Sequence, residues 1–297
     1  MQTEELLEGE WYRVSPLDCG QFSIVYKLRN SRDNKIYAGK IVNKNYSDKV
    51  RFIKKEIVIH KKLSHPNIVE LIANLETDIH IVHVLEFCSS GSLGYLWKKV
   101  KNFKECKVKN MFSQVISGLE YMHEQNIVHR DLKLDNILLE KNDDKTRGTY
   151  QVKICDFGFA AEIGKEEIFI DVGTPIFQAE ECFGGGDSFY SKFRLFNEDI
   201  RKDLENTDEY LAYKKKCFGI DVWSLGICIY SCLFKKYPFD AKNRQELNVK
   251  IRNLNYSLPI NEVSEDAKDL IAKIFVKSGD RIDLNGVKYT PFFYPLK

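Results

Sequence analysis

The first third of the chain shows short apolar runs separated by polar turns, which is the pattern of β-strands. Residues 22–29 (FSIVYKLR) and 35–42 (KIYAGKIV) are rich in β-branched and aromatic side chains, with a polar turn between them. Residues 79–87 (IHIVHVLEF) have the same character. Residues 50–63 instead place apolar side chains at helical spacing and stop shortly before a proline, so they predict a helix.

Helical periodicity dominates the chain after residue 90. One amphipathic helix is predicted between residues 108 and 122, and two short strand-like runs, NILL and QVKIC, follow it. The apolar run at 222–234 is too short to span a bilayer and predicts a buried helix. A small β-rich part followed by a larger α-rich part indicates an α+β fold with two lobes. The apolar face of the amphipathic helix consists of Val108, Met111, Phe112, Val115, Ile116, Leu119 and Met122.

The bulk composition is that of a globular protein without a strong charge. The chain has 297 residues, of which 43% are hydrophobic and 30% charged, and its net charge is +2. This balance argues against a nucleic-acid or anionic-membrane partner. The acidic start has no apolar run, so we expect no signal peptide, and we expect no membrane span. Eight single cysteines without a CxxC pair indicate free thiols, so we expect a cytoplasmic or nuclear location.

A polar turn near the N-terminus has part of the spacing of a phosphate-binding loop. In the register G-x-G-x-x-G-x-V, the stretch LDCGQFSIVYK supplies Asp18, Gly20, Ser23 and Val25, so only the middle glycine is present. Glycines at these positions let backbone N–H groups close around an anion. Taken alone, the stretch is either a nucleotide loop with two substitutions or an ordinary turn.

A second set of residues carries the groups that phosphoryl transfer requires. Asp156, in a DFG string, and Asn136, in HRDLKLDN, can hold Mg²⁺ on triphosphate oxygens. Lys40, in a predicted strand, can bind phosphates when Glu56 of the following helix holds it in place. Asp131 can orient a hydroxyl group and accept its proton.

Each of these residues, taken singly, has a plain structural explanation. Lys40 alone would be an exposed strand charge, Glu56 a helix-surface acid, and DFG a common turn composition. His129 and Cys155 are predicted to be packed, structural side chains. The order of the motifs along the chain makes the combined set specific.

This ordered set resembles the motifs of eukaryotic serine/threonine protein kinases, and the resemblance covers Trp11 to Phe293. The later strings GTPIFQAEE, DVWSLG and YPFD match as well. The resemblance implies a single kinase domain over residues 1–297, with an N-lobe at 11–88, a C-lobe at 89–297 and an insertion at about 184–216. It also implies ATP and Mg²⁺ as cofactors and proteins as substrates.

The same resemblance implies a role for each candidate residue. Lys40 is the lysine that holds ATP, and Glu56 is its helix partner. Asp131 is the catalytic base, and Lys133 steadies the transferred phosphate. The implied magnesium ligands are Asn136 and Asp156, and the implied nucleotide-binding residues are Leu17, Gly20, Val25, Ala38, Lys40, Glu56, Glu86, Cys88 and Leu138, with Leu85 as gatekeeper.

Several positions depart from the family pattern or leave its details open. Glu180 replaces a proline, which we expect to loosen a turn, whereas Arg281 is implied to pair with Glu181 as usual. EIVIHKKLSHPNIV, with His60, is similar to polo-like kinases, but GQFSIV and YAGKIV are similar to the calcium/calmodulin-dependent group. Two other function classes remain: a pseudokinase-like scaffold with weak or no phosphotransfer, and a small-molecule phosphotransferase. Lys133 favours a protein substrate.

The segment between DFG and GTP predicts an unusual mode of activation. Arg130 precedes the base, and kinases with this arginine usually need an anion on the activation segment. This segment has no serine, threonine or tyrosine before Thr174, but it contains Glu166, Glu167 and Asp171. We therefore predict activity without phosphorylation, with Asp171 or Glu167 partly neutralising Arg130. The alternative is a solvated acidic face on a loop ordered by apolar packing.

Two further predictions concern partners. Arginine-directed kinases carry acids at three places around the peptide groove, and here these places are Ser92, Asp135 and Ser231, so basic selectivity should be weak. In residues 184–216, an apolar stripe predicts a helix that either packs on the C-lobe or docks a partner. The stripe consists of Phe189, Phe193, Phe196, Ile200 and Leu204.

Overall fold

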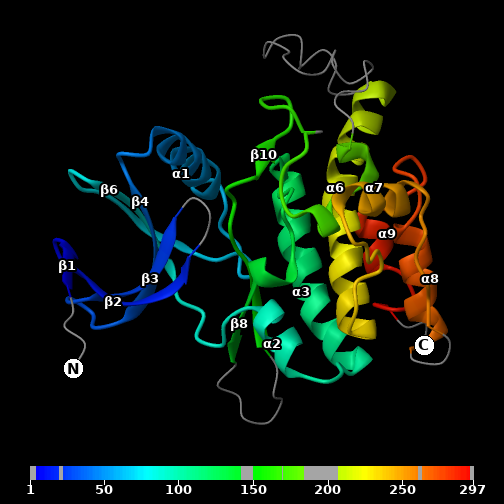
Figure 1. Cartoon of the computed structure of the whole chain (residues 1–297), viewed down its shortest axis with the longest axis horizontal. Helices are drawn as coiled ribbons and strands as arrows, with labels where there is room; N and C mark the ends of the chain where they lie inside the picture. The colour runs from blue at the N-terminus through cyan, green and yellow to red at the C-terminus, as the bar shows by residue number, and fades with distance from the viewer. Residues whose placement is uncertain are drawn as a thin grey trace.

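Two lobes lie side by side in the computed structural model (Figure 1). A β-sheet and helix α1 form one lobe, and most of the helices form the other. The two-lobed α+β fold predicted from the sequence is therefore confirmed. The structure describes residues 5–19, 23–141, 150–168, 170–183, 207–259 and 263–294.

The N-terminal lobe is built on a six-stranded antiparallel sheet with the strand order β1-β2-β3-β4-β6-β5. Consecutive strand residues point to opposite faces, so Ile41 joins the cluster around Trp11 while Val42 packs beneath α1 with Ile53. Lys40 therefore points to the α1 face. The elements are β1 (Glu5–Glu8), β2 (Trp11–Cys19), β3 (Ile24–Asn30), β4 (Ile36–Asn43), α1 (Ser47–His60), β5 (Leu71–Glu76) and β6 (His80–Glu86).

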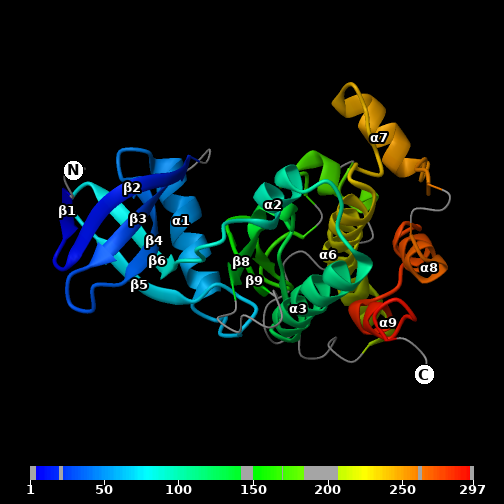
Figure 2. The same cartoon turned by 90° about the horizontal axis from the view of Figure 1, so that it is seen from below.

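The C-terminal lobe gathers its helices around α3 and α6, which lie at its centre (Figure 2). Strands β8 and β9 pair on the side of this lobe that faces the sheet lobe (Figure 2), and a second short pair joins β7 with β10. The helices are α2 (Leu93–Lys99), α3 (Glu105–Glu124), α6 (Asp208–Phe234), α7 (Arg244–Arg252), α8 (Glu265–Ile274) and α9 (Leu284–Lys288). The strands are β7 (Ile127–Val128), β8 (Ile137–Lys141), β9 (Tyr150–Ile154) and β10 (Ala161–Glu162). The 3₁₀ helices are η1 (Leu134–Asn136), η2 (Pro175–Phe177) and η3 (Glu180–Cys182).

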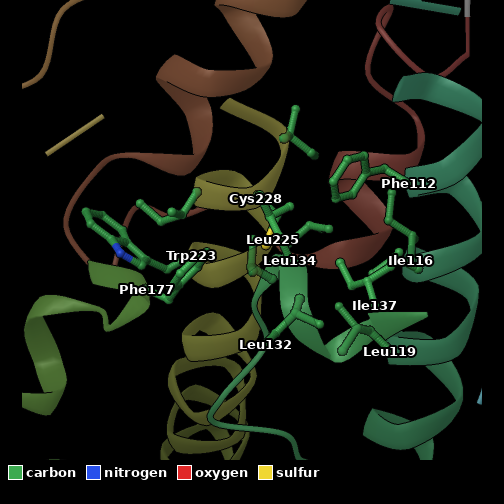
Figure 3. Packing of buried hydrophobic residues seen from close by; sticks show 14 of the residues in the cluster. Phe112, Ile116, Leu119, Leu132, Leu134, Ile137, Phe177, Trp223, Leu225 and Cys228 are labelled. Atoms are coloured by element: carbon green, nitrogen blue, oxygen red, sulfur yellow. The ribbon is translucent and has the colours of Figure 1, made fainter. Parts of the chain in front are cut away.

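The core of this lobe forms where α3 and α6 meet. Every apolar position predicted for the buried face of α3 is buried. Figure 3 shows Phe112, Ile116 and Leu119 of α3 in one cluster with Trp223 and Leu225 of α6. Because side chains from both helices fill this interface, α6 gives the catalytic elements that pack on it a rigid base.

Helix α6 is longer than the sequence pattern predicted. It begins at Asp208, where the side chain of Thr207 accepts a hydrogen bond from the N–H of Tyr210 at 3.3 Å, and it ends at Phe234. In the part of the chain that the structure describes, this is the one helix long and apolar enough to cross a membrane. Because 94% of the apolar stretch of α6 is buried inside the protein, α6 is packed as a core helix.

The end of the predicted insertion belongs to α6. Tyr210 and Tyr213 are buried in a cluster with Cys182 and Cys217, so residues 208–216 are part of the lobe rather than a separable insertion. The expected insertion at about 184–216 stays a prediction, because residues 184–206 lie outside the described ranges. The predicted apolar stripe of residues 189–204 lies outside the described residues, and its docking role stays a prediction.

The predicted ion pair of Arg281 and Glu181 joins two distant parts of the C-lobe. Two guanidinium nitrogens of Arg281 bind the Glu181 carboxylate at 2.5 and 3.1 Å, and one also donates to the carbonyl of Gly219 at 2.8 Å. Arg281 is 2% exposed. Glu180, the residue in place of the usual proline, starts η3 and pairs with Lys277, which supports the turn.

Arg281→Met should lower the free energy of unfolding by about 3–5 kcal/mol, because it leaves the Glu181 carboxylate buried without its partner. Chemical denaturation measures this loss. Lys277→Met breaks a more exposed pair with Glu180 and should cost less than about 1 kcal/mol. Equal losses in the two variants would contradict the structural role assigned to Arg281.

Candidate active site

Helix α6 holds residues 129–136, the loop that carries Asp131 (the catalytic loop), in a backbone conformation that is unfavourable for most residues. The φ angle of Arg130 is +65°, in the left-handed region. The fully buried carboxylate of Asp221 accepts the N–H groups of His129 at 2.9 Å and Arg130 at 3.0 Å, and it also bonds to His123 at 2.9 Å. Burial would raise the pKa of Asp221, but these hydrogen bonds and the histidines hold that pKa below its ordinary value.

His129 ties this loop to the DFG segment. Its Nδ1 accepts the N–H of Asp131 at 3.2 Å, so Nε2 carries the proton and donates to the carbonyl of Cys155 at 3.1 Å. Burial raises the pKa of the Cys155 thiol well above its ordinary value. His129 is therefore a packed structural side chain, as predicted, whereas Cys155 is only partly buried.

Both carboxylate oxygens of Asp131 are held by neighbours. Oδ1 accepts the N–H and the hydroxyl of Thr174, both at 2.8 Å. Oδ2 accepts Lys133 Nζ at 2.7 Å and the side-chain amide of Asn136 at 3.3 Å. Gly173 has a φ of +88°, and a Cβ there would lie 2.6 Å from a carbonyl of the catalytic loop. The catalytic loop and the activation segment thus meet at Asp131.

Lys40 forms the second centre of the site. Its Nζ lies 2.6 Å from Glu56 Oε2 and 2.8 Å from Asp156 Oδ1. Desolvation would lower the pKa of Lys40, but the two carboxylates outweigh it and raise that pKa. The Asp156 carboxylate is also crowded by protein atoms, yet Lys40 holds its pKa at about 2. Burial raises the pKa of Glu56, and Lys40 opposes that rise.

A small cavity of about 80 Å³ opens beside this ion pair, lined in part by Ser23, Lys40, Glu56 and Asp156. The side chain of Asp156 is 39% exposed, so one face of its carboxylate remains accessible. Within the described ranges, no group of three or more His, Cys, Asp or Glu side chains could hold a metal ion. A divalent ion here would therefore depend on oxygens from a bound phosphate, which fits the donor set of Asn136 and Asp156.

The residues predicted to surround a nucleotide come from both lobes. Ala38 and Leu85 face each other across β4 and β6, while Leu138 lies on β8 of the C-lobe. Leu17 and Val25 lie on β2 and β3. These hydrophobic positions therefore come from strands of both lobes.

Four other loop and hinge positions singled out in the sequence differ in what the structure says of them. Gly20 lies outside the described residues. Asp18 is exposed, and its carboxylate accepts the N–H of Cys19 at 2.8 Å. Glu86 uses its carboxylate to bind Lys153 at 2.8 Å, and Cys88 is buried.

Comparison with known families decides the identity of the fold. The model described as "Protein kinase domain" matches residues 12–193, which is more than half of the chain. The chain belongs to the protein kinase family.

Curated relatives place this kinase among the serine/threonine enzymes. It is 30% identical to the Arabidopsis thaliana "Serine/threonine-protein kinase SRK2J" over 269 residues, which cover 89% of this chain and 70% of that protein. It is 32% identical to the yeast "Cell cycle serine/threonine-protein kinase CDC5/MSD2" over 271 residues, but covers only 34% of that protein. A third relative, from Mus musculus, is named "Inactive serine/threonine-protein kinase PLK5" and is 32% identical over 96% of this chain and 43% of its own length. This chain is thus a protein serine/threonine kinase.

The activation segment of the kinase is held differently from the way the sequence predicted. Arg130 donates to two backbone carbonyls, those of Phe159 at 2.6 Å and Glu167 at 2.8 Å. Asp171, expected near Arg130, instead pairs with Arg244 of α7 at 2.7 Å. The prediction for Asp171 is therefore wrong, because α7 supplies a cation that the local sequence could not reveal.

A buried histidine pair behind Lys40 was not predicted. His60 Nε2 bonds to the carbonyl of Val69 at 2.7 Å, so it carries the proton, and Nδ1 accepts from His83 Nε2 at 3.0 Å. His83 lies opposite Lys40 in the sheet register. Burial, together with the Lys40 charge, lowers the pKa of His60 to about 4 and that of His83 to about 2.

This histidine pair should make the kinase less stable in acid. Unfolded histidines bind protons below about pH 6.5, whereas the folded pair resists protonation down to about pH 4. The pair therefore contributes its full stability above pH 6.5, and roughly 3 kcal/mol is lost per histidine, about 6 kcal/mol in all, as the pH approaches 4.

Urea unfolding at several pH values measures this slope. The double variant His60→Leu, His83→Leu should flatten it between pH 6.5 and 4, whereas His80→Gln, on a more exposed strand residue, should change it less. An unchanged slope in the double variant would show that other groups cause the acid loss.

Proposed function

We propose that this kinase transfers the γ-phosphoryl group of ATP to serine and threonine hydroxyls of proteins, with Asp131 as the base. The observation that carries the proposal is the arrangement of Lys133 and Thr174 around the Asp131 carboxylate. That carboxylate is 3% exposed, and hydrogen bonds fix both of its oxygens. It can orient a substrate hydroxyl and accept its proton without first reorganising.

Lys133 and Lys40 supply the positive charge that the reaction needs. Lys133 Nζ lies between Asp131 and Thr174, where it can steady negative charge on a phosphoryl group during transfer. Lys40 is assigned to the α- and β-phosphates of ATP, with Glu56 holding it in position. Such fixed charges lower the barrier most in a site that excludes water.

Asn136 and Asp156 are the residues that would hold Mg²⁺. When bound, Mg²⁺ neutralises phosphate charge and fixes the orientation of the triphosphate. The amide nitrogen of Asn136 donates to the carbonyl of Asp131 at 2.9 Å, so its amide oxygen is the atom for the metal. Asp156 stays ionised at neutral pH because of Lys40. The adenine would lie among Leu17, Val25, Ala38, Leu138 and the backbone of Glu86 and Cys88.

The competing function is that of a scaffold without phosphotransfer. One relative of this chain carries the word "Inactive" in its name, so this alternative needs a test. The ion pairs of Lys40 with Glu56 and Asp156 favour an enzyme, because a scaffold has no need to maintain three buried or half-buried charges at one point.

Asp131→Asn should lower turnover of a serine or threonine peptide by roughly 10²- to 10⁴-fold, because the amide cannot accept the proton. Nucleotide affinity, measured by calorimetry, should change little. Asp78→Asn, on an exposed turn, is the matched control and should keep full activity. If the wild-type chain bound nucleotide but turned over no more peptide than Asp131→Asn, the scaffold function would be favoured.

Substrate selection should depend little on basic residues. Ser92 Oγ caps helix α2, accepting the N–H of Tyr95 at 3.1 Å. Ser231 is fully buried, and its hydroxyl donates to the carbonyl of Ile227 at 2.7 Å. Asp135 is thus the one carboxylate among these three predicted groove positions, and it is exposed.

On a peptide array, arginine before the phosphorylated residue should improve activity no more than about fivefold, the effect of about 1 kcal/mol from one partly exposed pair. Asp135→Asn should remove most of this preference. A strict requirement for arginine that persists in Asp135→Asn would refute the assignment.

A further inference from the structure

Helix α1 and the activation segment are joined by an ion pair that the family resemblance did not suggest. Lys55 Nζ bonds to Glu166 Oε2. Lys55 directly precedes Glu56, the partner of Lys40, on α1. Any force that holds Lys55 in place therefore also acts on the turn of helix that positions Glu56.

Glu166 also lies in the electrostatic environment of Arg130. Burial lowers the pKa of Arg130, and among the charged groups around it the Glu166 carboxylate opposes this effect most. The guanidinium group of Arg130 donates hydrogen bonds to the backbone carbonyls of Phe159 and Glu167. Glu166 thus pairs with a cation of α1 and also contributes negative potential at the arginine of the catalytic loop.

Neighbouring contacts hold the same segment at a second point. Glu162 pairs with Lys62, just beyond the end of α1, and lies on β10, which pairs with β7 ahead of the catalytic loop. Ile163 and Ile168 are buried in the cluster with Cys182 and Tyr213. The Glu166 carboxylate is therefore carried on a backbone that packing has already ordered.

The segment offers no hydroxyl group that could replace this charge with a phosphate. From Asp156 to Gly173 the sequence contains no serine, threonine or tyrosine. The first hydroxyl is that of Thr174, which is bonded to Asp131 and Lys133. A phosphate there would displace the contacts that hold the base.

We propose that Glu166 is a positioning residue whose carboxylate bridges Lys55 and the surroundings of Arg130, so that α1 is held for catalysis without phosphorylation of the activation segment. This inference rests on the proposed kinase function. The contact has moderate exposure, with 31% of the Lys55 side chain and 32% of the Glu166 side chain accessible, so solvent screens it in part. We therefore expect effects of about five- to tenfold, equivalent to roughly 1 kcal/mol or slightly more.

A double-mutant cycle on phosphatase-treated full-length protein tests the bridge. Mass spectrometry first confirms that no phosphate remains. Glu166→Gln should lower kcat/KM for ATP about five- to tenfold while KM for the peptide stays unchanged. Lys55→Gln should have a similar but smaller effect. The double variant should lose less than the product of the two single losses, because both remove the same contact.

Hydrogen exchange gives a readout that does not need activity. Glu166→Gln should speed amide exchange in α1, residues 47–60, whereas Glu120→Gln, which breaks a surface pair with Lys288, should not. Asp131→Asn should lower turnover by roughly 10²- to 10⁴-fold and leave α1 exchange as in the wild type. This separates failure of the bridge from failure of the proposed function.

Two results would overturn the inference. The first is a wild-type protein that loses its activity on phosphatase treatment and regains it with an upstream kinase. The second is a Glu166→Gln variant whose α1 exchange matches that of Glu120→Gln. If the wild-type protein turned over no peptide in any state but Glu166→Gln still loosened α1, the bridge would stand and the kinase function would fall.

Discussion

The buried carboxylate of Asp221 is the interaction on which the active site depends. A carboxylate without solvent is costly unless several donors satisfy it, and here two backbone N–H groups and His123 do so. In return, it holds Arg130 at a positive φ and fixes the direction of the loop that carries Asp131. Helix α6 can do this because nearly its whole apolar length is locked into the core.

From that anchor, a continuous path of hydrogen bonds reaches the other lobe. His129 links the catalytic loop to the carbonyl of Cys155, and the next residue, Asp156, binds Lys40. Lys40 then binds Glu56 on α1. These polar contacts join the two lobes along one line, and Ile59 of α1 adds an apolar contact by packing in the large cluster of the C-lobe. Polar contacts suit this task because they are directional.

The sequence was sufficient to predict those features that local pattern encodes. The buried face of α3 and the central strands β3, β4 and β6 follow from periodicity, and the structure has them at the expected places. The motif order placed Lys40, Glu56 and Asp156 in one site, and the ion pairs among them agree with that. The first turns of α6 were missed because residues 208–216 are mostly charged and polar, and their burial depends on Cys182, far away in the chain.

The missed contacts share a physical cause, which is sequence separation. Asp221 lies about ninety residues from the loop it anchors, and Arg244 lies seventy-three residues from Asp171. A cation can be paired with an acid from sequence only when helix or strand spacing brings them together, and no such spacing applies here. The sequence identified the acids of the activation segment as candidates for neutralising Arg130. The structure was needed to show which cation each of them pairs with.

The partners of these acids lie on separate bodies, and this has a consequence for how the segment is ordered. Glu166 pairs with α1 of the N-terminal lobe, while Asp171 pairs with Arg244 on α7 of the C-terminal lobe. A phosphate would concentrate nearly two charges at one point and could draw several cations to it. Single carboxylates at two points bind each partner less strongly, so they depend more on a backbone that packing has ordered beforehand. The buried cluster around Ile168 provides that order, which makes apolar packing and fixed charge two parts of one mechanism rather than alternatives.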